Sequence, residues 1–234
     1  MAIRKLEEIS VSHHPEDAFA DGSGMSPSLR YTSDIAFTPT VKAIQSRKGS
    51  RRAYANMEAS RGWRNAITPD LAAFIAAQTS AFLATANAAG QPYIQHRGGP
   101  RGFLRVIDTS TIAFADFRGN RQYITQGNLA ENPKAHLFLV DYELRRRVKL
   151  WGRARVIEGD DALLAQLAPE GDASRAEQAI AFRVEAWDEN CPKHIPQRFE
   201  AADVARLLEE RDRRIATLEA ELVRLRAGAQ SKVV

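Results

Sequence analysis

Short runs of apolar residues, separated by Gly, Pro or Asp, dominate the middle of the chain. Several runs alternate apolar and polar positions, which is the pattern of a strand with one buried face. In residues 147–159, for example, Val148 and Leu150 alternate with Lys149 and Trp151. We predict strands over residues 80–87, 93–99, 103–108, 111–117, 135–142, 147–159 and 179–187. This pattern favours an antiparallel barrel or sandwich, so the expected fold class is mainly β with flanking helices.

Helical patterns flank these strands. Residues 68–78 begin with Thr68 as a potential cap and a proline in the first turn, and their apolar positions share one face. Residues 42–64 hold seven Lys/Arg against one Glu. They fit either a clamp on a polyanion or a solvated helix pair broken at Gly49, and we favour the helix pair. Shorter helices are expected before Asn132 and over residues 161–168.

The two ends of the chain differ from its middle. Residues 1–33 are polar and are expected to form a flexible leader. From Ala201 to Arg226, apolar residues occupy the a and d positions of a heptad, which only Arg211 interrupts. We therefore predict an amphipathic helix within residues 200–234, either paired as a coiled coil or packed singly on the barrel. The domain itself is expected over residues 34–199.

Composition narrows the class of protein. The 234 residues are 44% hydrophobic and 26% charged, as in ordinary globular proteins. The first residues lack the apolar stretch of a secretory signal and no window is apolar enough to span a membrane, so neither is expected. With a single cysteine, Cys191, the cytoplasm is the expected compartment. A net charge of +4 leaves nucleic acid an unlikely partner. His13 and His14 lack further ligands, so no metal is expected, and Cys191 near His194 is a weak candidate nucleophile.

Cationic and amide side chains gather at the predicted strand ends. The stretch FADFRGNRQY, residues 114–123, places Arg118, Asn120, Arg121 and Gln122 around a glycine. A plain surface turn would explain the glycine and asparagine, whereas an anion pocket would also explain the two arginines. Barrel mouths commonly hold planar cofactors, and an anionic one would account for both the charge and the glycines.

The order of several motifs resembles a known family. AFTPTVKAIQSRKGSRRAY, HRGGP, FRGNRQY and NCPKHI follow one another over about residues 33–199. In this order they resemble the FMN-binding split barrels related to pyridoxamine 5'-phosphate oxidase, and within these the predicted flavin-nucleotide-binding branch. The resemblance implies a split antiparallel β-barrel, a homodimer with flavin at the subunit interface, and FMN as cofactor.

The same resemblance assigns residues to the site. Those assigned to FMN are Arg97, Gly98, Ala115, Asp116, Arg118, Asn120, Arg121, Gln122, Arg147 and Trp187, and those on the substrate side are Lys193 and His194. Gln122 replaces a lysine of the family's phosphate segment, so this loop brings less charge to the phosphate. Arg147 stands where the oxidase carries a glutamine from the second subunit, which could restore the missing charge. No residue is assigned a catalytic role.

Two functions follow as hypotheses. The first is an FMN-dependent oxidoreductase of the pyridoxamine 5'-phosphate oxidase type, with a small-molecule substrate or an electron donor such as NAD(P)H. The second is a non-catalytic carrier or sensor that binds flavin, haem or a deazaflavin, because a fold does not fix a function.

Overall fold

The computed structural model describes residues 30–168, 176–190 and 193–230. The chain forms two compact units: Met1–Asp141 with Arg146–Cys191, and Tyr142–Arg145 with Pro192–Val234. Most of the predicted leader, up to residue 29, lies outside the described residues, as does Cys191. A short 3-10 helix, η2 (Thr32–Ile35), begins inside the last part of that predicted leader.

The basic segment forms two helices, α1 (Pro39–Arg47) and α2 (Arg51–Ser60). They are separated at Gly49, whose φ of 81° suits a glycine. The helix pair expected from the sequence is therefore confirmed. Within it the buried carboxylate of Glu58 accepts a short hydrogen bond from Arg51 and lies 3.6 Å from Lys42 Nζ. The only acid of this segment is thus neutralised by two of its bases.

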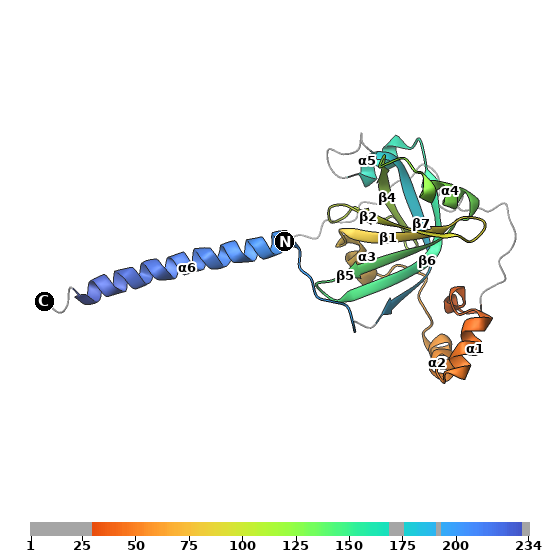
Figure 1. The fold of residues 1–234 in the computed structure, drawn as a ribbon, viewed down its shortest axis with the longest axis horizontal. Helices are drawn as coiled ribbons and strands as arrows, with labels where there is room; N and C mark the ends of the chain where they lie inside the picture. Colours follow the sequence, from red (N-terminus) through yellow and green to blue (C-terminus); the bar gives the residue numbers. More distant parts are fainter. Residues whose placement is uncertain (1–29, 169–175, 191–192, 231–234) are drawn as a thin grey trace. The chain divides into compact units, whose positions relative to one another are not determined.

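A seven-stranded antiparallel sheet forms the body of the first unit (Figure 1). Its strands are β1 (Ser80–Ala86), β2 (Pro92–Gly98), β3 (Arg105–Val106), β4 (Thr111–Phe117), β5 (Lys134–Asp141), β6 (Arg146–Ile157) and β7 (Ala176–Asn190). The strand order is β2-β1-β5-β6-β7-β4-β3. Only two residues of the predicted strand 103–108 pair as β3, because Phe103 closes a turn by donating its N–H to Pro100 O.

One core unites strands that lie far apart in this order. Leu83 of β1, Leu137 of β5 and Phe114 of β4 belong to one buried cluster. Helix α3 (Pro69–Ala76) adds Leu71 to it, and Thr68 Oγ1 caps α3 by accepting from Leu71 N at 3.3 Å. Because strands from both halves of the sheet share one core, the sheet curls into the split antiparallel barrel expected from the sequence.

The two remaining helices of this unit pack differently: α4 (Ile124–Glu131) adds Leu129 to the barrel core, whereas α5 (Asp161–Leu167) lies outside that core. Helix α5 packs its leucines against Ala113 and Ala179, on the opposite face of β4 and β7. Helix α4 ends at Asn132, as predicted, and begins directly after the loop of residues 118–123. Helix α4 therefore borders the loop at the end of β4, the candidate phosphate loop.

Strand β6 has the alternating faces that its sequence predicts. Val148 and Leu150 are buried in the core, whereas Lys149 and Trp151 are partly exposed on the other face. The pairing of β6 with β7 shifts register between Trp151 and Gly152. A Cβ added at Gly152 would lie 1.9 Å from Arg183 O, so only glycine allows this close approach of the two strands.

Helix α6 (Ala201–Gln230) belongs to the second unit and confirms the predicted C-terminal helix. Apolar side chains at its heptad positions are exposed, for example Leu208 at 53% and Leu222 at 51%. Within the described ranges, no helix is both long and apolar enough to cross a lipid bilayer.

Candidate functional site

The last residues of β4 face β2 across the opening of the barrel. Arg97 of β2 forms a short ion pair with Asp116 Oδ1 of β4, and Gln178 Nε2 of β7 donates to Asp116 Oδ2 at 2.9 Å. Strands β2 and β4 lie near opposite ends of the sheet order, so this ion pair joins the two edges of the curled sheet. Both charged side chains are nearly buried, at 13% and 12% exposure.

The loop after β4 is held in an unusual backbone conformation. Arg121 has a φ of 60° and Tyr123 a φ of 53°, a region that residues other than glycine seldom adopt. Asn120 Oδ1 accepts from Gln122 N at 3.4 Å, and Tyr123 Oη donates to Glu177 Oε1 at 3.1 Å. Strained loops of this kind are common at ligand sites, so the conformation supports a functional role over a plain turn.

This loop lines a cavity of about 330 Å³, which we call the β4 cavity. The predicted site residues that line it are Arg97, Asp116, Arg118, Asn120, Arg121 and Gln122. Among the described residues, neither Arg118 nor Arg121 has an ion-pair partner. With the Arg97–Asp116 pair neutral, these two guanidiniums exceed the one further acid of the lining, Glu177, so the cavity keeps a net positive charge that suits a phosphate.

The other predicted residues lie elsewhere. Gly98 and Ala115 adjoin Arg97 and Asp116 along their strands but do not line the cavity, and the Ala115 methyl group packs towards α5. Lys193 and His194 are exposed residues of the second unit, and His194 has a φ of 66°. Sequence order thus predicts the loop cluster, but it does not separate residues that face a cavity from their strand neighbours.

Arg147 and Trp187 are also separate from the β4 cavity within one chain. Arg147 lies on β6 opposite Val140, and its Nε is buried without a hydrogen-bond partner among the described residues. Trp187 lies on β7, is only 6% exposed and donates from Nε1 to Ala66 O at 2.9 Å. One chain therefore brings six of the twelve predicted site residues into one cavity.

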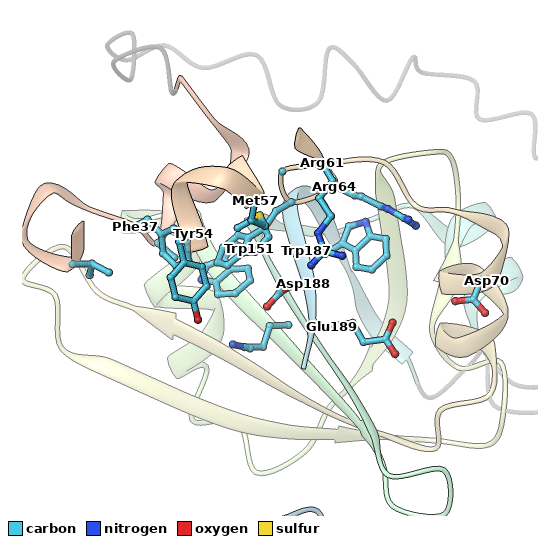
Figure 2. A pocket seen from close by; sticks show the side chains of 15 residues that line it. Phe37, Tyr54, Met57, Arg61, Arg64, Asp70, Trp151, Trp187, Asp188 and Glu189 are labelled. Atoms are coloured by element: carbon cyan, nitrogen blue, oxygen red, sulfur yellow. The ribbon is translucent and has the colours of Figure 1, made fainter. Parts of the chain in front are cut away.

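A second, larger cavity of about 650 Å³ lies between residues 36–64 and strands β6 and β7 (Figure 2). All three tryptophans of the chain, Trp63, Trp151 and Trp187, line it, so we call it the tryptophan cavity. Trp63 stacks on Trp151 with ring centroids 4.6 Å apart, and Phe37 lies 4.9 Å from Trp63. Our sequence reasoning missed this cavity, although the polar-side position of Trp151 on β6 was a signal.

Charged groups lie among these rings. Lys149 and Asp188 face each other in the register of β6 and β7, and burial raises the pKa of Asp188 although Lys149 and Arg61 are near. Behind Trp151, burial and the charge of Lys149 lower the pKa of His136 to about 4. A positive and an acidic group therefore share an aromatic cavity.

Ion pairs fix the rim of the tryptophan cavity. Arg146 Nη2 lies 2.6 Å from Asp70 Oδ2, and Arg146 Nε lies 2.7 Å from Glu189 Oε1. Burial alone would lower the pKa of Arg146, but these two carboxylates raise it. Across the part of the chain that the structure describes, no three His, Cys, Asp or Glu side chains gather in a way that could hold a metal.

Comparisons with known proteins place this geometry in a wider context. The model of the family described as "Pyridoxamine 5'-phosphate oxidase" matches residues 67–191. No curated protein matches the chain. Similar solved structures include HupZ from Group A Streptococcus, with 23% identity over 57% of this chain and 99% of that one, at a TM-score of 0.41.

Two further solved structures are similar at comparable levels. An FMN-binding protein from Syntrophomonas wolfei is 14% identical over 65% of this chain and 97% of its own, with a TM-score of 0.38. HutZ, the haem storage protein from Vibrio cholerae, is 19% identical over 51% of this chain and 89% of its own, with a TM-score of 0.37. These TM-scores lie below 0.5, so the three structures assign neither a cofactor nor an activity to this chain.

Proposed function

The chain belongs to the pyridoxamine 5'-phosphate oxidase family, and from this membership we propose that it is a homodimeric flavoprotein that uses FMN in an oxidoreductase reaction. The observation that supports it most is the β4 cavity, where Arg118 and Arg121 project from a strained loop without ion-pair partners in the described chain. A bound phosphate would satisfy both guanidiniums.

The residues of the β4 cavity have distinct roles in this proposal. Arg121 and Asn120 bind the phosphate, and Arg118 and Gln122 line the same cavity. Asp116 is a positioning residue, because its ion pair fixes Arg97 at the barrel opening. FMN, when bound, supplies hydride and electron transfer, and the protein contributes binding, orientation and charge. The substrate and the electron donor, for which NAD(P)H is one candidate, stay open.

Assembly as a homodimer would complete the site. We propose that Arg147 and Trp187 reach a flavin held mainly by the other subunit, with Lys193 and His194 on the substrate side. The buried Arg147 Nε without a described partner supports this, since a buried donor normally has an acceptor.

We also propose that α6 takes part in the assembly by pairing with α6 of the second subunit as a parallel coiled coil. Cytoplasmic location, and the absence of nucleic-acid and membrane partners, stay predictions of the sequence.

The phosphate assignment is tested by replacing Arg121 with Ala. Loss of one charge-assisted hydrogen bond should weaken FMN binding by roughly 1.5–3 kcal/mol. The matched control is Arg52→Ala, which removes an exposed arginine of α2 that does not line the cavity. Fluorescence titration of FMN measures both. An unchanged dissociation constant for Arg121→Ala would place the phosphate elsewhere.

The interface assignment is tested by complementation. Arg121→Ala and Arg147→Ala proteins should each bind FMN weakly, because each lacks one contribution to both sites of its dimer. After subunit exchange, every mixed dimer should contain one intact site, so FMN binding should partly return. Exchange is verified separately with differently tagged subunits. If exchange occurs and binding does not recover, the site lies within one chain.

A non-catalytic carrier or sensor of flavin, haem or deazaflavin is the alternative. The purified protein distinguishes the two functions. Oxidoreductase function predicts a yellow protein whose flavin absorbance is bleached by a suitable donor such as NADPH without air and returns with oxygen. A carrier would keep its absorbance with every donor tried, and a haem or deazaflavin chromophore would be identified by mass spectrometry after release.

A further inference from the structure

We propose that the tryptophan cavity is a separate binding site for a planar nitrogen heteroaromatic molecule with a hydrogen-bond donor and an acceptor on one edge. It shares no lining residue with the β4 cavity. If Trp187 adjoins the flavin in the dimer, the bound molecule would be the reaction partner of the flavin. That role rests on the proposed function, whereas binding in the cavity does not.

The cavity exists because a segment outside the matched family region covers the sheet. Residues 36–64 form one wall, and β6 and β7 form the other. One hydrogen bond joins the end of this cover to β7, from Trp187 N to Arg64 O at 2.8 Å, and a second, from Trp187 Nε1 to Ala66 O at 2.9 Å, holds the chain directly after the cover. At the other side, Thr32 Oγ1 of η2 donates to Trp63 O at 2.5 Å. The end of the cover is thus held by Trp187 and by η2, so the cavity is present without a bound ligand.

The aromatic walls favour a flat ligand. Tyr54, Phe37, Trp63 and Trp151 form a continuous row of ring contacts, with centroid separations of 5.2, 4.9 and 4.6 Å. Figure 2 shows Phe37, Tyr54 and Trp151 of this row along one side of the cavity and Trp187 on the other side. Aromatic faces stack on planar rings irrespective of their substituents, so the walls select for shape.

The polar groups select the edge of the ligand. Figure 2 shows Asp188 between Trp151 and Trp187, and Lys149 is its partner in strand register. Among the described residues neither side chain has a hydrogen bond to another side chain: Asp188 has a backbone hydrogen bond at Glu189 and the nearby charge of Lys149, and Lys149 Nζ lies 5.5 Å from the Trp151 ring centroid. Polar groups that are partly buried in apolar surroundings favour a ligand that satisfies them. A ring edge with adjacent acceptor and donor groups would accept from Lys149 and donate to Asp188.

Charge argues against a cationic ligand. Arg61 and Arg64 line the cavity, and Arg64 Cζ lies 5.3 Å from the Trp187 ring centroid. Of the three acids that line it, Asp70 and Glu189 are paired with Arg146. Only Asp188 therefore balances Lys149 and the two arginines, so a neutral or anionic molecule is preferred.

Because all three tryptophans line this cavity, intrinsic fluorescence reports directly on it. We choose pterin as the probe, since it is planar and carries an amide edge, and quinoxaline as the matched bicyclic ring without that edge. Pterin should quench tryptophan fluorescence saturably, and quinoxaline should bind about tenfold or more weakly, the factor for one lost hydrogen bond. Absence of saturable quenching, or equal affinity for the two probes, would overturn the proposal.

Three variants assign the binding to this cavity. Asp188→Asn and Lys149→Met should each weaken pterin binding about tenfold, and having two variants guards against one that fails to fold. Arg121→Ala should bind pterin with unchanged affinity even where FMN binding is lost, so the two proposals can fail separately. Pterin affinity that survives both cavity variants, or that falls with Arg121→Ala, would overturn the assignment of a separate site.

Discussion

Arg97 and Asp116 are two residues that sequence order places in one site and that only the structure pairs. The family resemblance assigns each of them to the flavin by its position in a motif. It cannot reveal that they neutralise each other, because their contact depends on how far the sheet curls. In the structure they join β2 to β4 and are nearly buried. The pair therefore contributes to barrel closure as well as to the cavity.

This double role leads to a prediction for stability. Asp116→Ala leaves the Arg97 charge buried without its partner and should lower the free energy of unfolding by about 3–5 kcal/mol. Arg97→Met in the same chain should recover part of that loss, because the orphaned charge is then removed. Denaturant unfolding of the single and double variants measures the coupling. Strictly additive losses would show that the two side chains do not interact.

His136 gives a pH-dependent prediction. Its pKa falls from an ordinary 6.5 to about 4 in the folded chain, through burial and then the charge of Lys149. Between these two values the unfolded chain binds the proton more readily, so stability should fall as pH drops from 6.5 towards 4. The stability of the His136→Gln variant should fall less over this pH interval. Urea unfolding at pH 7, 5.5 and 4.5 tests this, and parallel pH profiles for the two proteins would contradict it.

At the scale of single elements, the sequence predicts a helix or strand well where a capping residue or one apolar face determines it. Thr68 caps α3 as expected, and the alternation along β6 separates core from surface. The predicted strand 103–108 was mostly wrong, because a turn at Phe103 removes it from the ladder. Apolar alternation does not record which backbone groups are already bonded, so such a turn is invisible in the pattern.

Substitution of two glycines tests whether local sequence or contact with a neighbouring strand decides which residue a position accepts. Gly152→Ala places a Cβ against Arg183 O of the neighbouring strand and should destabilise the protein by about 3 kcal/mol or more. Gly127→Ala is the matched control, since Gly127 is exposed within α4 and an added Cβ meets nothing within 4 Å. It should be neutral or stabilise by up to about 1 kcal/mol. Thermal unfolding measures the stability of both variants, and a similar loss in the two would contradict the predicted clash at Gly152.

At the scale of the whole molecule, the order of the motifs in the sequence predicted the fold, but it did not predict which distant residues share a cavity. The loop residues Asn120 and Arg121 meet in one cavity, as their neighbourhood in sequence implies. Trp187 lines a different cavity, and Arg147 lies in neither. The tryptophan cavity is built by residues 36–64 folding onto β6 and β7, a long-range contact with no signature in local pattern. Sites formed by one loop are therefore more predictable than sites formed between distant segments.

The exposed heptad of α6 predicts how two copies of the chain associate. With Ala201 at an a position, a parallel pair sets Arg214 of one helix opposite Glu219 of the other, and Glu221 opposite Arg226. These attractions favour the parallel arrangement. Because a split-barrel dimer has its own interface, deletion of residues 201–234 should leave a dimer that binds FMN with reduced thermal stability. Light scattering that shows a flavin-free monomer would make α6 the principal contact.

Charge reversal separates coiled-coil pairing from any other role of α6. Glu219→Arg with Glu221→Arg sets like charges opposite each other in a parallel pair, and each exposed pair contributes roughly 0.2–1 kcal/mol. We expect a lower melting temperature that rises again when Arg214→Glu and Arg226→Glu are added to the same chain. The rescue should weaken at high salt, since exposed pairs are screened. If the fourfold variant stays as unstable as the double variant, α6 does not pair in this register, because only that register makes the second pair of substitutions compensate the first.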